Sequence, residues 1–315
     1  MKAVAIYEHG DRSVLRLTDL PEPRAESHDV LIRVRATGIN PLDTKVRDGS
    51  FGRLMGKFPK VLGAECAGVV EAVGELVTDF SPGDRVVASL GPVGGGYAER
   101  VSTHEKNVAH LPDAVDFRDG AALVVGGLTS LIALRDQGHL RPGEHVVING
   151  ASGGVGVAGV QIGKILHGHM TAVCSAANAE LVQSLGADRV IDYKTTDFTK
   201  EPEQFRRYRI VFDAVGKRSL SECRDVLSKD GVYVSTLPSP KQIAETVLST
   251  FAEQKAKVVA FAFRREDMAW LLQHAAEGRL KAVIDRTYTL DQIAEAHEYS
   301  ESGRVKGKLV VDMGE

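Results

Sequence analysis

The stretch VVINGASGGVGVAGVQIGK, residues 146–164, decides the fold of the domain that contains it. It begins as a run of β-branched apolar residues, passes through a cluster of glycines, and continues with small and apolar residues at helical spacing. This order predicts a buried strand, a sharp turn and a closely packed helix. Residues 151–156, ASGGVG, fit the pattern A-x-G-x-x-G, a variant of the fingerprint of dinucleotide-binding turns.

A turn of this kind presents the free N–H groups and the positive dipole end of a helix to a pyrophosphate. We expect Gly153 to let the backbone approach the phosphates, and Gly156 to let the helix pack closely on the strand. Ala151 stands where the fingerprint has its first glycine, so this position must have a conformation that alanine adopts. Ser152 adds a hydroxyl donor. An ordinary glycine-rich loop is the alternative, but the strand before the motif and the helix after it favour a dinucleotide site.

Strand-like and helix-like segments alternate beyond Asp116. The helical pattern NAELVQSLGAD is closed by Gly186, and SLSECRDVLSKDG begins with Ser219 and Glu222 at the spacing of a capping box. The strand-like segments are HVVING, MTAVCS, RVIDY, IVFDAV, GVYVSTL and KVVAFAF. Strands that alternate with helices of this length predict βαβ units and a parallel sheet.

The residues before Asp116 are β-rich instead. In DVLIRVRATGIN, Ile32, Val34 and Ala36 alternate with arginines, as expected for a strand with one buried face. The segments CAGVVEAVG and GDRVVASLG predict short strands that end at glycines. Between the two parts, FRDGAALVVGGLTSLIALRDQG predicts a helix with a break at Gly126-Gly127. A last strand near the C-terminus lies too far from the final βα unit to extend it, and could return to the N-terminal domain.

Composition limits the function. The formal charge of −3 gives no electrostatic basis for binding nucleic acid or an anionic membrane. No apolar run reaches the roughly 18 residues of a membrane span, and the N-terminus reads as a strand and a turn, not as a signal peptide. Cys66, Cys174 and Cys223 are far apart and form no CxxC pair, so no disulfide framework or zinc knuckle is indicated. We therefore expect a cytoplasmic protein.

The loop after the second strand of the dinucleotide domain indicates which dinucleotide binds. The usual fingerprint has Asp or Glu there to hold the ribose 2′-hydroxyl, whereas this sequence reads AVCSAANAE, with Ser175 and Asn178 neutral. A carboxylate would repel a 2′-phosphate, and hydroxyl and amide groups would not. Tyr193 and Lys194 follow the next strand and could supply further donors. NADPH is therefore favoured; the alternative is that Ser175 and Asn178 only cap the following helix.

Taken together, these features resemble a known family. The chain is similar to the zinc-independent quinone oxidoreductases of the medium-chain dehydrogenase/reductase superfamily, near the alkenal/enone reductase branch. The resemblance extends over nearly the whole chain, in the order of the family. Its blocks are TGINPLDTKVRDG (37–49), LGAECAGVVEAVG (62–74), FSPGDRVV (80–87), GGYAERV (95–101), GGLTSLIAL (126–134), GASGGVGVAGVQIGK (150–164), LGADRVIDY (185–193), VFDAVG (211–216) and ESGRVKGKLVV (301–311).

The resemblance implies an α/β fold of two domains. A β-rich, GroES-like catalytic domain would span residues 1–116 and be completed by 265–315, which accounts for the last strand. A Rossmann domain, with a doubly wound parallel sheet that binds NADP, would span residues 117–264. The family also implies a homodimer.

Zinc divides this superfamily. Its zinc-dependent alcohol dehydrogenases would have Cys near position 40 and Gly-His-Glu near positions 63–65, whereas this chain has Asn40 and Gly63-Ala64-Glu65, and lacks the four-cysteine lobe. A catalytic zinc needs three protein ligands, of which Glu65 alone remains. None of the ten histidines has a ligand-like spacing, so we expect them in solvated or hydrogen-bonded surface positions. We expect no metal site.

The resemblance therefore implies an NADPH-dependent oxidoreductase that transfers hydride without a metal. Its acceptor would be a small molecule that takes hydride readily, either a quinone or the β-carbon of an α,β-unsaturated aldehyde or ketone. One alternative is an NADPH-binding sensor or a crystallin-like structural protein with little catalysis. Another is an enoyl-thioester reductase, but Phe51 stands nearest to the position where that branch has a tyrosine acid.

The resemblance also assigns site residues. Asn40 would contact the nicotinamide ribose, and Lys45 would stabilise enolate charge, or else bind only the ribose or lie solvated at the rim. Asp43 would brace its loop. The remaining cofactor contacts would come from Thr129, Ser152, Gly153, Gly154, Val155, Ser175, Asn178, Tyr193, Phe261, Phe263 and Lys306. Phe261 and Phe263, expected on the last βα strand, could instead belong to the core, and Lys306 and Lys308 could reach the cofactor or be exposed. Many relatives have Arg or Lys in the 175–178 loop, which here holds Ala176-Ala177.

Overall fold

The computed structural model describes residues 1–52, 57–236 and 239–314, and divides the chain into two compact units. The β-rich unit comprises Met1–Val125, Phe263–Gly278 and Ala282–Glu315. The parallel-sheet unit comprises Gly126–Ala262 and Arg279–Lys281. The division falls inside helix α2, Phe117–Leu131, whereas the expected boundary at 116/117 lies at the start of that helix.

The β-rich unit contains two sheets. A three-stranded antiparallel sheet has the order β2-β1-β4, with β1 at Lys2–Ile6, β2 at Arg16–Asp19 and β4 at Lys60–Val61. A seven-stranded sheet has the order β15-β16-β3-β5-β6-β8, with β7 paired to β3. Its strands are β3 (Asp29–Ile39), β5 (Glu65–Val73), β6 (Arg85–Ser89), β7 (Arg100–His104), β8 (Val108–His110), β15 (Ile284–Tyr288) and β16 (Lys308–Asp312).

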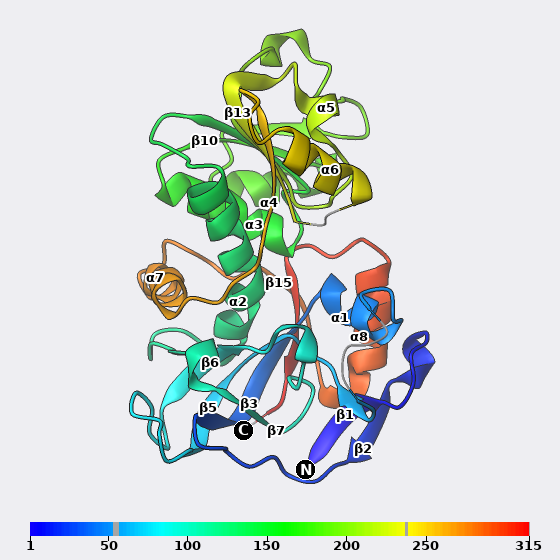
Figure 1. Ribbon diagram of the computed structural model, residues 1–315, viewed down its shortest axis with the longest axis vertical. Coiled ribbons are helices and arrows are strands. Elements are labelled where there is room, and N and C mark those ends of the chain that lie inside the picture. The colour runs from blue at the N-terminus through cyan, green and yellow to red at the C-terminus, as the bar shows by residue number, and fades with distance from the viewer. Residues whose placement is uncertain (53–56, 237–238, 315) are drawn as a thin grey trace. The chain divides into compact units, whose positions relative to one another are not determined.

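The sequence pattern explains the central strand of this sheet. Ile32, Val34 and Ala36 of β3 are buried, and the arginines between them are more exposed, as the alternation predicts. β16 pairs antiparallel with β3, with Leu309 opposite Ile39, so the C-terminal strand returns to the N-terminal unit as expected. Figure 1 shows it in red, in the same sheet as the blue and cyan strands. The unit also contains helices α1 (Pro41–Arg47), α7 (Arg265–Ala276) and α8 (Ile293–Glu301).

The other unit is built on a six-stranded, all-parallel sheet with the order β11-β10-β9-β12-β13-β14, drawn from green to yellow in Figure 1. The order reverses beside β9, which is the topological switch point of a doubly wound fold. The strands are β9 (His145–Asn149), β10 (His169–Cys174), β11 (Arg189–Asp192), β12 (Tyr208–Asp213), β13 (Leu227–Ser235) and β14 (Lys255–Val258). The helices are α3 (Gly154–Ile165), α4 (Ala179–Ser184), α5 (Leu220–Cys223) and α6 (Pro240–Leu248).

Two local predictions in this unit are wrong. The segment after Ser219 forms a helix of only four residues, because β13 already begins at Leu227. The Ser219 hydroxyl donates to the Glu222 carboxylate and caps no backbone N–H, so there is no capping box. The prediction for α4 is confirmed: the helix ends just before Gly186, whose φ of 105° is a left-handed conformation typical of helix ends.

The predicted break at Gly126-Gly127 is also wrong. α2 runs through both glycines and continues into a π-helical turn, Ile132–Gln137. A Cβ on Gly126 would lie 2.8 Å from the Gly154 carbonyl oxygen, so this glycine serves close packing of two helices and not a break. The combined helix Phe117–Gln137 has the length and apolar composition of a membrane span, but 78% of its most apolar window is buried, as in the core helix of a globular fold.

Candidate functional site

In the turn after β9, the residue with left-handed backbone conformation is Gly150, one position before the fingerprint. Gly150 has φ 84°, and its N–H and that of Ala151 both donate to the Val173 carbonyl of β10, at 3.1 and 3.0 Å. Ala151 is fully buried. The left-handed conformation thus falls on a glycine, which is why alanine is tolerated where the fingerprint usually has glycine.

The surroundings of the two fingerprint glycines differ. Gly153 is the N-cap of α3, and a Cβ there would meet a single atom within 4 Å, the Gly150 carbonyl oxygen at 3.6 Å. A Cβ on Gly156 would lie only 2.2 Å from that same oxygen. The space beside Gly153 is therefore open to a ligand, and Gly156 permits close packing. Since Gly154, Val155 and Gly156 form the first turn of α3, their N–H groups have no partner within the helix.

Helix α2 holds this turn from the other side. The Ser130 hydroxyl donates to the Val155 carbonyl at 2.7 Å, and Thr129 beside it is 7% exposed. Thr129 is among the predicted cofactor contacts; Ser130 is a residue that sequence reasoning missed. The run of small residues GGLTS was the available signal, since it allows two helices to approach closely.

The adenosine side of the predicted site is joined to the glycine turn. The Asn178 side-chain amide donates to the Ser152 hydroxyl oxygen at 3.0 Å. The Asn178 carbonyl oxygen is buried and has no hydrogen-bond partner in the part of the chain that is described. A buried acceptor of this kind needs a donor, and a hydroxyl of a bound nucleotide would provide one. Ser175 is half-buried, and Tyr193 and Lys194 are exposed.

A carboxylate that sequence reasoning missed lies near this loop. Strands β10 and β11 pair in parallel with Cys174 opposite Asp192, so Asp192 lies beside the residue that precedes Ser175. Its carboxylate accepts the Lys194 backbone N–H at 3.0 Å. The sequence has no acidic residue directly after β10, but the pairing of the two strands brings Asp192 of β11 close to this loop. The strand register was the information that the sequence lacked.

The β-rich unit contains a buried ionic cluster around Asn40, Glu65 and Lys308. The Lys308 ammonium lies 2.6 Å from the Glu65 Oε1 atom and 2.6 Å from the Asn40 Oδ1 atom. The Asn40 amide in turn donates to Glu65 Oε1 at 2.8 Å. Glu65 is fully buried, and Asn40 and Lys308 are each 5% exposed. Burial of charge at this depth requires pairing, which the three side chains provide for one another.

The backbone completes the shell of the Glu65 carboxylate. The Val125 N–H donates to its second oxygen, Oε2, at 2.6 Å. A Cβ on Gly38 would lie 2.0 Å from Oε1, so only glycine fits at that position of β3. In the described residues, no group of three or more His, Cys, Asp or Glu side chains is arranged to hold a metal ion. The sequence singled out Glu65 and Asn40, but left open whether Lys308 reaches the cofactor or is exposed.

Asp43 braces the start of α1, as expected. Its carboxylate accepts the Asn40 backbone N–H at 2.7 Å and is 3% exposed. Burial raises the pKa of Asp43 to about 7, the Asn40 N–H opposes this rise, and the negative charge of Glu65 adds to it. The ordinary value for this carboxyl group is 3.8.

Four other predicted site residues lie outside the hydrogen-bonded clusters described above. Lys45 is half-buried on α1, and its ammonium has no hydrogen bond or ion pair to any described residue. Lys306 is exposed. The prediction that Phe261 and Phe263 lie on a strand is wrong, because β14 ends at Val258 and both residues lie in the irregular segment beyond it.

The prediction that the histidines lie at the surface is wrong for two of them. His297 on α8 is completely buried, with its ring between Tyr97 and Arg47. His274 on α7 is 8% exposed, and its Nδ1 atom lies 2.9 Å from the Trp270 carbonyl oxygen. Neither position shows a spacing signal in the sequence, because each partner lies on another element or is a backbone group.

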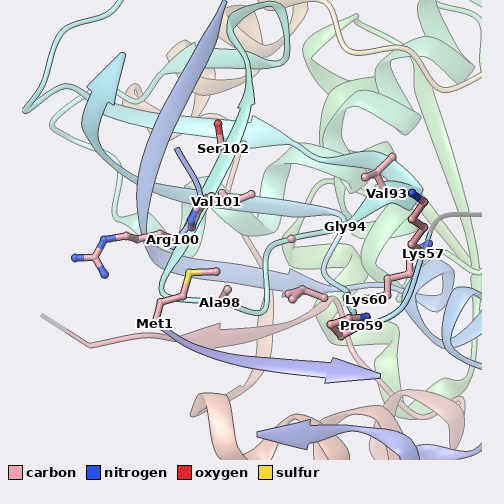
Figure 2. Close-up of a pocket in the computed structure, with 13 residues that line it drawn as sticks. Met1, Lys57, Pro59, Lys60, Val93, Gly94, Ala98, Arg100, Val101 and Ser102 are labelled. Carbon is pink, nitrogen blue, oxygen red and sulfur yellow. The ribbon is translucent and has the colours of Figure 1, made fainter. Parts of the chain in front are cut away.

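A cavity of about 630 Å3 lies in the β-rich unit. It is lined by residues at the N-terminus, at 57–61, 93–95 and 98–102, and Figure 2 shows Lys57, Lys60 and Arg100 around it. Arg100 is paired with Glu71 at 2.6 Å. None of the predicted site residues lines this cavity.

Comparison with known proteins places these features in a family. The alcohol dehydrogenase GroES-like domain matches residues 26–113, and the zinc-binding dehydrogenase family matches residues 185–311. The chloroplastic quinone oxidoreductase of Triphysaria versicolor is 34% identical, over 99% of this chain and 98% of that protein. The quinone oxidoreductase of Rattus norvegicus is 33% identical, over 99% of this chain and 97% of that protein.

A solved structure adds a nucleotide complex. The Escherichia coli quinone oxidoreductase complexed with NADPH matches with a TM-score of 0.89 and 26% identity, over 99% of this chain and 100% of that one. The fold expected from the sequence is therefore confirmed, a Rossmann parallel sheet with a β-rich GroES-like domain. The chain belongs to the quinone oxidoreductase family of the medium-chain dehydrogenase/reductase superfamily, whose members are NAD(P)-dependent oxidoreductases.

Proposed function

We propose that this protein is an NADPH-dependent reductase that transfers hydride, without a metal ion, to a quinone or to the β-carbon of an α,β-unsaturated aldehyde or ketone. The start of α3 carries this proposal: free N–H groups lie at Gly154 and Val155, and open space lies beside Gly153. The buried, unpartnered carbonyl oxygen of Asn178 lies next to this turn and fits a nucleotide hydroxyl. The names of the relatives give independent support.

The residues of this chain would orient the reactants and stabilise charge. When bound, reduced nicotinamide supplies the hydride. Asn40 is held on both sides by Glu65 and Lys308, yet an amide has two N–H hydrogens and several lone pairs. It therefore retains capacity to orient a ribose hydroxyl. The Lys45 ammonium, without a described partner, would stabilise the negative oxygen that forms when the acceptor takes up hydride.

The preference for NADPH rests on Ser175 and Asn178, which are neutral where a ribose-binding carboxylate usually lies. Asp192 on the neighbouring strand works against that preference, but its carboxylate is engaged by the Lys194 backbone N–H. We therefore propose NADPH as the better cofactor, with NADH as a weaker one. The complex of the E. coli relative with NADPH supports the same choice.

The test combines binding with turnover. Calorimetry would measure the dissociation constants of NADPH and NADH, and loss of the reduced nicotinamide absorbance would report turnover with a set of quinones and enones. We expect Gly153→Val to abolish nucleotide binding, because its side chain would fill the space in front of α3, and Ala269→Val at an exposed helix position to leave it unchanged. Tight NADPH binding without turnover of any acceptor would instead favour a sensor or structural role.

We further propose a homodimer in the cytoplasm. β14 is the last strand of the sheet order, and within the described chain it pairs with β13 alone. Close to it in sequence, Val247, Leu248 and Phe251 are 69%, 81% and 100% exposed. A free strand edge flanked by apolar side chains is suited to a second copy of the same chain. The three cysteines are free and buried, which suits a reducing compartment.

A further inference from the structure

A line of buried polar side chains connects the end of α1, through α8, with the start of α1. The Arg47 Nη1 atom lies 3.2 Å from His297 Nδ1, and His297 Nε2 lies 3.2 Å from the Tyr97 hydroxyl. The Tyr97 phenol lies beside the Asp43 carboxylate, and its hydroxyl lowers the pKa of that group. Arg47 and Asp43 are each 3% exposed, and Tyr97 and His297 are completely buried. Arg47 and Asp43 lie at the two ends of α1, and His297 on α8 and Tyr97 before β7 lie between them in the line of contacts.

The direction of every hydrogen bond in this chain follows from its first member. A guanidinium can only donate, so His297 must accept from Arg47 at Nδ1. Burial, together with the charge of Arg47, lowers the pKa of His297 to about 3, so the ring is neutral and carries its one hydrogen on Nε2. That N–H donates to the Tyr97 oxygen, and the Tyr97 hydrogen is left to point at Asp43. Asp43 is the final acceptor.

Asp43 connects this chain of hydrogen bonds to Asn40. Its carboxylate accepts the Asn40 backbone N–H at 2.7 Å, and the Asn40 side chain lies between Glu65 and Lys308. The charged and titratable groups that face Asp43 are Glu65, Lys308 and Tyr97. A protonated Asp43 would keep one acceptor oxygen but lose the negative charge that attracts the Tyr97 hydrogen most strongly. The chain is therefore strongest while Asp43 is ionised.

We propose that Tyr97 and His297 are positioning residues for the reaction: they keep Asp43 a hydrogen-bond acceptor, and Asp43 fixes Asn40 and the first turn of α1. This inference rests on the proposed function, because it assigns Asn40 to the nicotinamide side. Arg47 is anchored independently, by the Glu301 carboxylate at 2.6 Å and by the Gly10 carbonyl at 3.2 Å. Arg47 therefore determines the direction of the hydrogen bonds in this chain, and its own position does not depend on them.

The first test needs no activity. Nitrogen-15 NMR of the histidine rings distinguishes the two neutral tautomers and the protonated form, and the signal lost in His297→Gln identifies His297. We expect a neutral ring with its hydrogen on Nε2 that stays neutral at about pH 5, where exposed histidines protonate. A protonated His297 at that pH, or a hydrogen on Nδ1, would overturn the inference.

The second test is the pH profile of kcat and KM with NADPH and a quinone. Tyr97→Phe removes a donor that lowers the pKa of Asp43, so the acid limb of kcat/KM should move to higher pH. The loss should be roughly tenfold at about pH 6 and small in alkali. His297→Gln retains an amide N–H toward Tyr97 and should lie close to the wild type, whereas His297→Phe should resemble Tyr97→Phe. Tyr7→Phe is the control, at a tyrosine that is 46% exposed.

The outcomes separate the two proposals. If the wild type turns over but Tyr97→Phe and His297→Phe keep its pH profile, the positioning role is refuted and the proposed function stands. If the wild type reduces no acceptor, the proposed function fails, and the positioning role fails with it. If Tyr97→Phe does not fold, His297→Phe and the NMR measurement decide the question.

Discussion

Replacement of Lys308 by methionine tests the buried ionic cluster most directly. The substitution keeps most of the volume of the side chain and removes its ammonium group, which contacts Glu65 and Asn40 at 2.6 Å each. Glu65 would then remain a fully buried carboxylate with only the Val125 N–H and the Asn40 amide as donors. We expect a large loss of stability, confined to the β-rich unit.

The geometry sets the size of this loss. At 2.6 Å, two unit charges in a medium of effective dielectric constant near 20 attract by about 6 kcal/mol. The release of Lys308 from burial offsets part of this energy, and breaking a buried pair costs about 3–5 kcal/mol. The two remaining donors to Glu65 favour the lower end, so we expect about 3 kcal/mol. In Lys308→Met combined with Glu65→Gln, no unpaired charge is left, and the loss should be about 2 kcal/mol smaller than the two single effects added together.

The assay is equilibrium unfolding in urea, followed by tryptophan fluorescence. The chain has one tryptophan, Trp270 on α7, and it belongs to the same unit as the cluster. Its signal reports this unit even if the two units unfold separately. Lys306→Met is the matched control, since Lys306 is exposed two residues away and its substitution should change the free energy of unfolding by less than about 0.5 kcal/mol.

The reasoning would be wrong if Lys308→Met cost less than about 1 kcal/mol, a value ordinary for an exposed ion pair. It would also be wrong if the two substitutions were additive, because a cluster whose members neutralise one another cannot respond as independent sites.

Three further predictions concern the cofactor, the pH dependence and the assembly. Ser175→Asp should raise the dissociation constant of NADPH roughly tenfold by repulsion of the 2′-phosphate and change that of NADH much less; equal effects in calorimetry would contradict the assignment. The pKa of Asp43 is about 7 in the folded protein, compared with its ordinary value of 3.8. Between these pH values the folded state binds a proton that the unfolded state has lost, so the free energy of unfolding should fall as the pH rises from about 4 to 7. Asp43→Asn should flatten this fall in urea midpoints measured across the range, and an unchanged slope would exclude Asp43 as its source. Phe251→Glu should convert the proposed dimer into a monomer in light-scattering measurements, whereas a dimer that persists would place the interface elsewhere.

The sequence predicted the architecture because the architecture follows local periodicity. Alternation over residues 30–36 indicated the central strand of the β-rich unit, and the glycine turn indicated the start of the parallel sheet. The close packing predicted for Gly156 is confirmed, because a Cβ there would clash with a carbonyl oxygen, and Gly153 faces open space. The return of the last strand to the N-terminal unit came from resemblance, since periodicity left two possible positions for it.

The interior of the candidate site could not be predicted in the same way. The sequence left the position of Lys308 open and predicted a surface position for His297. The burial of both depends on partners 200 or more positions away. Asp192 reaches the adenosine side only through the pairing of two parallel strands. The predicted helix break at Gly126 failed because glycine can serve close packing as well as flexibility, and the sequence does not distinguish the two.

The displacement of the left-handed residue from position 151 to Gly150 has a consequence for mutational scanning and for motif searches. Two adjacent small residues should show opposite tolerance: any side chain at Gly150 meets an unfavourable φ, whereas Ala151→Gly should fold and bind nucleotide normally. A search pattern that demands glycine at the first fingerprint position would discard this chain and others built like it. A pattern anchored on the residue before it would retain them.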